Sequence, residues 1–401
     1  MRTVTLDTQQ RTIKHNFSIL EYLYWGSLCT LAFNVLFLQQ CGFDSVQIGT
    51  IMAVNNVLGM LSPIVWGYAA DRLQSQKRVF LISAAFTATS TVLLPLTMHT
   101  RVLGIPLTVP LLGLFMVSYS GSYSLLDGWL VSVVSQHTGK LHYANIRLWG
   151  AIGYSSISVL LTFVVRNTQI GVAYYAAAAL GLFVLLWAQR QTETGAKLHR
   201  PKTREGIRPW ILLKNPLFLS MLLLSFGIHF SINASTTFLP YLMDEVGLDK
   251  SLFSAVSGLR GLAEVPMLLL GASLLRTVIP SKALSISAIL LLIELLCYCV
   301  IGAMWQVIAL QAVAGLAYGL YLCIAPQYAQ QLAPEHLAAS AQSMRVTMVF
   351  AGNIAASLLG GWIIKQQGAA MLYIIVGIIL FLITLVFIAS SIVTAKKTKD
   401  I

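Results

Sequence analysis

The chain of 401 residues is 57% hydrophobic and only 10% charged, with a mean hydropathy of +0.77. Soluble domains carry roughly 25% charged residues, so this composition excludes an ordinary soluble protein. The 26 Lys and Arg residues exceed the 14 Asp and Glu residues, which gives a net charge of +12. The basic residues lie in short breaks between apolar runs. We therefore expect an all-α membrane protein whose partner is the lipid bilayer and not a nucleic acid.

The apolar runs are long enough for helices that cross the membrane, because about 20 residues span about 30 Å of hydrocarbon. Divided at Gly, Pro and charged breaks, the sequence predicts twelve helices. Their residues are 17–38, 46–69, 79–98, 108–135, 146–166, 170–188, 216–240, 251–273, 283–302, 305–328, 338–364 and 369–392. The first run lacks a small-residue cleavage site, so we expect it to be retained rather than removed as a signal peptide. Pro63, Pro240 and Pro266 are expected to kink or end their helices.

The distribution of Lys and Arg predicts the orientation of the chain. With both termini in the cytoplasm, 19 basic residues fall on the cytoplasmic side and four on the other, which is the positive-inside pattern. The one long hydrophilic segment, 189–215, follows the sixth predicted helix and is expected to be a cytoplasmic linker. It divides an N-terminal six-helix half, 1–188, from a C-terminal half, 216–401. We expect a monomeric, multi-pass protein of the cell inner (plasma) membrane.

The loop between the second and third predicted helices carries a recognisable motif. It contains the segment GYAADR followed after a short interval by KR, and a weaker echo, PMLLLGASLLRTVIPSK, begins in the eighth predicted helix. The segment resembles the loop signature of the major facilitator superfamily. This resemblance implies two pseudo-symmetric six-helix halves and alternating access. It also implies a gating role for Gly67, Asp71, Arg72, Lys77 and Arg78. Physically, Gly67 would permit close helix packing, and Asp71 would accept bonds from a helix N-terminus or a cation.

A second motif opens the fifth predicted helix with the segment YANIRLWGAIG, which contains Arg147 and Trp149. It resembles the corresponding stretch of the lactose permease, phenylpropionate permease and nucleoside–proton symporter group. In the lactose permease an acidic residue of the fourth helix, at the position of Asp127 here, pairs with the arginine. The short segments GIH, which includes His229, and GLAEV resemble the phenylpropionate permeases. The resemblance implies a proton-coupled transporter of a sugar, nucleoside or aromatic acid that binds its solute at Asp127, Arg147, Trp149 and His229.

The chain departs from the lactose permease in the residues that couple transport to protons. The ninth predicted helix carries Glu294 instead of an arginine, and the tenth has no ionisable group except Tyr. Arg260 and Glu264 are four residues apart and share one helix face, and Glu294 on the next helix could join them. Charged groups in apolar helices are costly unless they are paired. We therefore expect Glu264, with Arg260 and Glu294, to carry the coupling proton, and we expect no other cofactor.

Further polar and aromatic residues occur near or within the predicted helices. Glu21 and Arg345 lie near helix ends and are expected to extend to the membrane interface. Aromatic side chains could stack on a ring of the solute or lie in the interface belts. These aromatic residues are Tyr22, Tyr24, Trp25, Tyr119, Tyr123, Trp129, Trp149 and Tyr241.

Other classes of function fit the sequence less well. A drug exporter of the same superfamily is the main alternative, but its fifth helix usually carries G-x-x-x-G-P-x-x-G-G, and residues 148–165 have neither the proline nor the glycine pair. A membrane enzyme would need a metal cluster or a nucleophile motif, and the five cysteines lack the spacing of metal ligands. The sequence also lacks a phosphate-binding P-loop. We expect a transporter, not an enzyme, that uses an ion or solute gradient.

Overall fold

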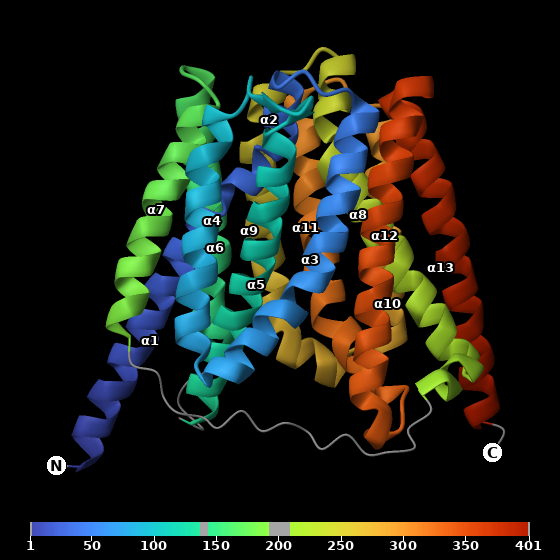
Figure 1. The fold of residues 1–401 in the computed structure, drawn as a ribbon. Helices are drawn as coiled ribbons and strands as arrows, with labels where there is room; N and C mark the ends of the chain where they lie inside the picture. The colour runs from blue at the N-terminus through green and yellow to red at the C-terminus, as the bar shows by residue number, and fades with distance from the viewer. Residues whose placement is uncertain (1, 137–142, 192–208, 400–401) are drawn as a thin grey trace. The chain divides into compact units, whose positions relative to one another are not determined.

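The computed structural model describes residues 2–136, 143–191 and 209–399, and almost all of them are helical (Figure 1). Within these ranges, twelve helices are long and apolar enough to cross a membrane. The prediction of an all-α membrane protein with twelve spans is confirmed.

The elements of the first part of the chain are α1 (Arg2–Ser27), η1 (Cys29–Ala32), α2 (Asn34–Gln40), α3 (Ser45–Leu73), α4 (Gln76–Leu96), β1 (Arg101–Val102), β2 (Ile105–Pro106), α5 (Thr108–Ser135), α6 (Tyr143–Arg166) and α7 (Gly171–Arg190). Those of the second part are η2 (Pro209–Lys214), α8 (Pro216–Glu245), η3 (Lys250–Leu252), α9 (Phe253–Thr277), α10 (Pro280–Tyr298), α11 (Met304–Gln331), η4 (Glu335–Leu337), α12 (Ala338–Gln367) and α13 (Ala369–Lys399).

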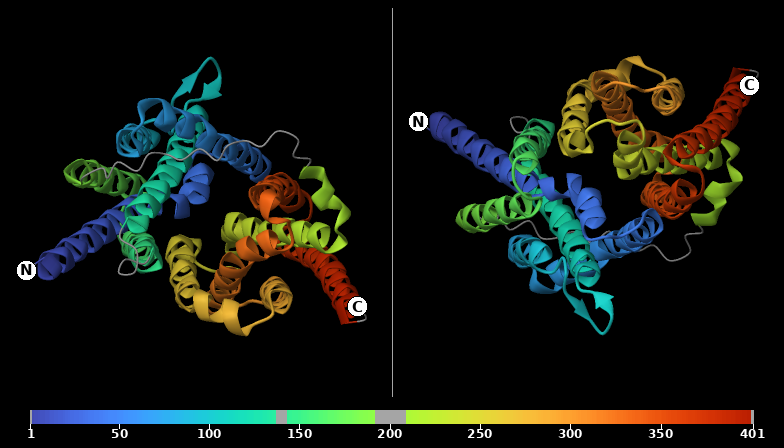
Figure 2. Two further views of the ribbon diagram at one scale, coloured as in Figure 1. Left: turned by 90° about the horizontal axis from the view of Figure 1, so that it is seen from below. Right: turned by 90° about the horizontal axis from the view of Figure 1, so that it is seen from above.

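The helices pack into two compact units. Unit 1 comprises Met1–Gly42 and Val54–Pro201, and unit 2 comprises Phe43–Ala53 and Lys202–Ile401. In unit 1, α4 packs against α5 and α7, and α1 packs against α6 and α7. In unit 2, α8 packs against α12 and α13, while α11 packs against α9 and α10 (Figure 2). Each unit therefore has its own helical core.

The first turns of α3 belong to unit 2, although the sequence placed them in the N-terminal half. The Ser45 hydroxyl donates to the carbonyl oxygen of Gly361 at 3.0 Å, and a Cβ added at Gly49 would collide with the carbonyl of Ser357. At the start of α3, the Lys365 ammonium lies 2.9 Å from an Asp44 carboxylate oxygen. These contacts hold the start of α3 against α12, which a boundary drawn from hydrophilic segments cannot reveal.

The first span is broken, whereas the sequence predicted one continuous helix over residues 17–38. After α1, the Leu28 N–H donates to the Trp25 carbonyl at 3.1 Å, and the chain continues as the short 3₁₀ turn η1 before α2 begins. Beside the break, the Ser27 hydroxyl donates to the carbonyl of Tyr24 at 2.6 Å. Such a side-chain bond competes with the helical ladder, so α1 ends on a tightened turn.

Proline residues do not end the helices in which they lie. Helix α8 continues past Pro240 to Glu245, and Pro63 and Pro266 lie inside α3 and α9. The expectation that Pro240 marks the end of its helix is wrong. A proline removes one backbone donor, whereas ending the helix within an apolar medium would leave several backbone groups without partners.

Glycines set the close helix contacts that position the polar residues of each unit. A Cβ added at Gly153 of α6 would collide with the carbonyl of Tyr22 on α1. In unit 2, Gly315 and Gly319 of α11 lie against α9, where an added Cβ at Gly319 would be 2.8 Å from the Glu264 carbonyl. Close backbone approach of this kind requires residues without side chains.

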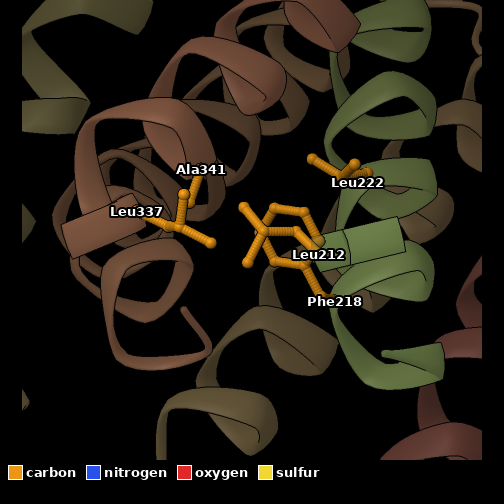
Figure 3. Packing of buried hydrophobic residues seen from close by; sticks show 5 residues of the cluster. All are labelled: Leu212, Phe218, Leu222, Leu337 and Ala341. Carbon is orange, nitrogen blue, oxygen red and sulfur yellow. The ribbon is translucent and has the colours of Figure 1, made fainter. Parts of the chain in front are cut away.

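An apolar cluster packs η2 against the N-terminal turns of α8 and α12 in unit 2. Figure 3 shows the side chains of this cluster between the two helices. Its buried members are Leu212, Phe218, Leu222, Leu337 and Ala341. The Asn215 side chain caps α8 by accepting from the N–H of Leu217 at 3.0 Å. The cap and the cluster together fix where α8 begins.

Candidate functional site

The main polar cluster of unit 1 is built around Arg147 of α6. Its Nε atom lies 3.7 Å from Asp127 Oδ1 of α5, and one terminal nitrogen lies 3.9 Å from Glu21 Oε2 of α1. The guanidinium carbon lies 4.2 Å from the centroid of the Trp25 ring and 5.9 Å from that of Tyr123. The predicted juxtaposition of Asp127 and Arg147 is present. One cation is therefore shared by two carboxylates from two other helices.

The two carboxylates of this cluster have different surroundings. The Asp127 side chain is 27% exposed and accepts a hydrogen bond from the Tyr143 hydroxyl at 2.8 Å. The Glu21 side chain is 0% exposed, and neither of its oxygens has a hydrogen-bond partner among the described residues. The expectation that Glu21 extends to the membrane interface is therefore wrong. Glu21 is the site residue that the sequence interpretation missed.

The helix face that carries Arg147 also carries the glycine that makes room for the cluster. A Cβ added at Gly150 would lie 2.5 Å from the Trp25 ring and 3.0 Å from Glu21 Oε2. Trp149 lies elsewhere, because a position two residues after Arg147 is on nearly the opposite side of a helix. Its side chain is 43% exposed. The structure does not bring Trp149 to the cluster, so its role in solute binding stays a prediction.

Unit 2 contains a second buried charged cluster, around Arg260 of α9. Its guanidinium lies 4.0 Å from Glu294 Oε1 of α10 and donates to Gln311 Oε1 at 3.4 Å. It also donates to the Ser235 hydroxyl at 3.3 Å. Arg260 and Glu294 are both almost fully buried, with 5% and 1% of their side chains exposed. Glu294 therefore joins Arg260, which the sequence left open. Glu264, one helical turn from Arg260, is half-buried, and its role in proton coupling stays a prediction.

His229 lies in an aromatic cluster of unit 2. Its ring meets Tyr318 and Tyr321 edge to face, with centroids 5.6 and 5.4 Å away. The hydroxyl of Tyr321 accepts a hydrogen bond from Arg345 at 3.1 Å. Arg345 is buried, so the expectation that it extends to the interface is wrong. His229 is also buried, which fits a packing role as well as a ligand role, and its part in solute binding stays a prediction.

The residues of the predicted gating motif have separate surroundings. The Lys77 ammonium donates to the carbonyls of Gln189, at 2.8 Å, and Gln191, and so caps the end of α7 with positive charge. Arg72 and Arg78 are exposed. A Cβ added at Gly67 would meet nothing within 4 Å, so the close packing expected there is not present. The gating role of Gly67, Asp71, Arg72, Lys77 and Arg78 stays a prediction.

Comparisons with known proteins identify the family of the chain. The sequence profile described as MFS_1 like family matches residues 15–375. The chain belongs to this family. This major facilitator transporter is 24% identical over 397 residues to the maltose permease of Geobacillus stearothermophilus, covering 97% of each chain. It is also 22% identical over 366 residues to the uncharacterized transporter YwbF of Bacillus subtilis (strain 168), covering 90% of this chain and 89% of that one.

Two solved structures show the same fold. A mutant of the nucleoside transporter NupG has a TM-score of 0.79 at 17% identity, with 94% of this chain and 99% of that chain covered. A D-xylose–proton symporter has a TM-score of 0.72 at 13% identity, with 94% and 96% covered. The family and the fold identify the protein as a multi-pass membrane transporter rather than an enzyme.

Proposed function

We propose that this transporter moves a small, uncharged, ring-containing solute of the sugar or nucleoside class across the plasma membrane by alternating access, with the proton as coupling ion. The observation that carries the proposal is the Arg147 cluster of unit 1. Its arginine is about one-quarter exposed, with 24% of its side chain accessible, and lies against the ring of Trp25. A guanidinium fork can donate two parallel hydrogen bonds to solute oxygens, and an aromatic ring nearby can stack on a sugar or a base.

The charge of the cluster narrows the class of solute. Arg147 contributes one positive charge, which the Asp127 carboxylate balances even when Glu21 is protonated, and ionised Glu21 would make the sum −1. In either state the cluster offers no excess positive charge to attract an anionic aromatic acid. Hydroxyl groups of a neutral solute can instead donate to Asp127 while they accept from Arg147. The named relatives support this class, because they include a maltose permease, a nucleoside transporter and a D-xylose–proton symporter.

Counterflow in proteoliposomes tests the proposal without requiring an energy source. Purified protein is reconstituted with unlabelled maltose, D-xylose or uridine inside, and entry of the labelled solute is measured. We expect labelled uptake above empty liposomes for at least one of the three, and none for phenylpropionate. The proposal fails if phenylpropionate alone exchanges, or if none of the three neutral solutes does.

Arg147→Lys tests whether the cluster binds the solute. An ammonium keeps the charge but cannot form the two-pronged contact, so we expect a loss of at least about tenfold in exchange. Arg166→Lys is the matched control, since Arg166 ends the same helix and is exposed. Exchange should be unchanged in that variant. Equal exchange by Arg147→Lys and the wild type, at equal amounts of folded protein, would remove Arg147 from the site.

A further inference from the structure

Glu21 is a buried carboxyl group to which neither the family resemblance nor the motifs assign a role. Its side chain has no exposed surface, and both oxygens lack hydrogen-bond partners among the described residues. The nearest charge is the Arg147 guanidinium at 3.9 Å, which is longer than a hydrogen-bonded ion pair. A buried carboxylate without donors is unfavourable, whereas the neutral acid form loses less on leaving water. The position therefore suits a group that gains and loses a proton.

Asp127 differs from Glu21 in its exposure and in its hydrogen-bond partner. Asp127 is partly exposed and accepts a hydrogen bond from the Tyr143 hydroxyl at 2.8 Å. Glu21 is fully enclosed, and the indole N–H of Trp25 is the donor beside it, although it does not meet hydrogen-bond geometry. Two carboxylates that share one arginine can take different roles when their surroundings differ in this way.

The charged and titratable groups on α1 and on the helices around it bear on whether Glu21 can change its protonation state. Helix α6 brings Arg147, whose charge opposes protonation of Glu21, and α5 brings Asp127, whose charge favours it. Helix α7 has one charged residue, Arg190, in its last turn. The indole N–H of Trp25, one turn from Glu21, is buried and also has no acceptor among the described residues. The uncharged titratable groups are Tyr22 and Tyr24 of α1, Tyr119 and Tyr123 of α5, Tyr143 of α6, Tyr174 and Tyr175 of α7, and Cys29 of η1.

We propose, building on the function proposed above, that Glu21 is the group that carries the coupled proton. When Glu21 is protonated, the attraction between its side chain and Arg147 is lost, and the guanidinium pairs with Asp127 and with solute oxygens. When the solute leaves, the proton leaves Glu21, and the carboxylate again pairs with Arg147. Solute and proton are thereby coupled because both control which groups the same arginine contacts. This assigns coupling to unit 1 rather than to Glu264, the residue predicted from the sequence.

Glu21→Gln separates exchange from coupled transport. The amide has the shape of the protonated acid but cannot release a proton. With the solute that wild type exchanges, we expect counterflow to be kept and uptake driven by an inside-alkaline pH gradient to stop at the external concentration. Glu21→Asp retains a carboxyl group and should restore uphill uptake. Glu245→Gln is the matched control, since Glu245 is exposed at the end of α8, and its uphill uptake should equal that of wild type.

The outcomes distinguish this inference from the proposed function. If Glu21→Gln accumulates the solute as wild type does, the inference is overturned while the proposed function stands. If uphill uptake is lost in Glu264→Gln and kept in Glu21→Gln, the sequence-based assignment is right and this one is wrong. If wild type exchanges none of the solutes, the proposed function fails, and that result does not bear on the protonation of Glu21.

A measurement without solute tests the protonation directly. Infrared difference spectra of the purified protein between acidic and alkaline pH report carboxyl groups that gain a proton, through the C=O band of the neutral acid. We expect one such band to disappear in Glu21→Gln and to remain in Asp127→Asn. The same bands in Glu21→Gln and wild type would show that Glu21 does not titrate and would overturn the inference.

Discussion

Gly150 lies where three side chains of the unit 1 cluster meet. An added Cβ would lie 2.5 Å from the Trp25 ring, 2.6 Å from an Arg147 nitrogen and 3.0 Å from Glu21 Oε2. Gly150→Ala must therefore displace the arginine or the ring. We expect solute exchange in the counterflow assay to fall at least about tenfold, because a misplacement of about 1 Å in a binding group has effects of that size or larger.

Gly59→Ala provides the control for this substitution. The nearest atom to a Cβ added at Gly59 is 3.9 Å away, which is an ordinary van der Waals distance. Exchange by Gly59→Ala should match wild type. If Gly150→Ala also matches wild type, the packing around Arg147 does not matter for transport and the site is misassigned.

The residues of the unit 1 cluster differ in how far the sequence could predict them. Asp127 and Arg147 were found because the segment around Arg147 is distinctive and its acidic partner has a known place on the preceding helix. Glu21 was missed because the first helix was predicted to begin at residue 17, which placed Glu21 one turn from the interface. Helix α1 begins at Arg2 instead, and the Glu21 side chain is 0% exposed where it faces Arg147 of α6. Its position along the apolar run did not show which side of the helix carries Glu21.

Asp44 and Gln47 form the N-terminal cap of α3. The Gln47 N–H donates to Asp44 Oδ1 at 2.8 Å, and the Asp44 N–H donates to Gln47 Oε1 at 3.0 Å. The Gln47 N–H and the Lys365 ammonium lower the pKa of Asp44 below its usual value. We expect Asp44→Ala to destabilise the protein by about 1 kcal/mol at neutral pH, as loss of a cap does. Thermal unfolding in detergent would measure this.

The pH dependence of that effect has a definite sign. A lowered pKa in the folded state adds stability that is complete above the unfolded value of about 3.9 and is lost as the pH falls through the folded value. The difference between Asp44→Ala and wild type should therefore be constant from pH 7 to pH 5 and shrink below about pH 4. Asp244→Ala is the control, because exposed Asp244 pairs with Lys250 at 3.0 Å without capping α3. A difference that grows with acidification would contradict the assignment of the cap.

At the scale of helices, the sequence predicted the number and type of the elements well. Long apolar runs predict membrane-spanning helices clearly, because backbone N–H and C=O groups in hydrocarbon must form their hydrogen bonds within the helix. The break at 28–33 and the continuation of α8 beyond Pro240 were not predictable from apolar content, since they depend on local bonds such as that of Ser27. Packing of the start of α3 with unit 2 likewise depends on contacts between residues more than 300 positions apart.

The orientation of the whole molecule is predicted from its basic residues and can be measured at described positions. Leu103 lies at the turn between β1 and β2, a hairpin that leads into the start of α5 (Figure 2), and it is 97% exposed. Arg78, at the start of α4, is also exposed and belongs to the predicted cytoplasmic side. After replacement of the five free cysteines, a cysteine at 103 should react with an impermeant maleimide in intact cells. A cysteine at 78 should react only after permeabilisation, and labelling of both from outside would contradict the topology.

Uptake driven by an imposed pH gradient tests the central claim, that this transporter couples movement of a neutral solute to protons. Proteoliposomes with an alkaline interior are given labelled solute, chosen as the one that exchanges best in counterflow, with and without a protonophore. We expect accumulation above the external concentration that the protonophore abolishes. Uptake that stops at the external concentration whether or not the gradient is present would show an uncoupled carrier and contradict the claim.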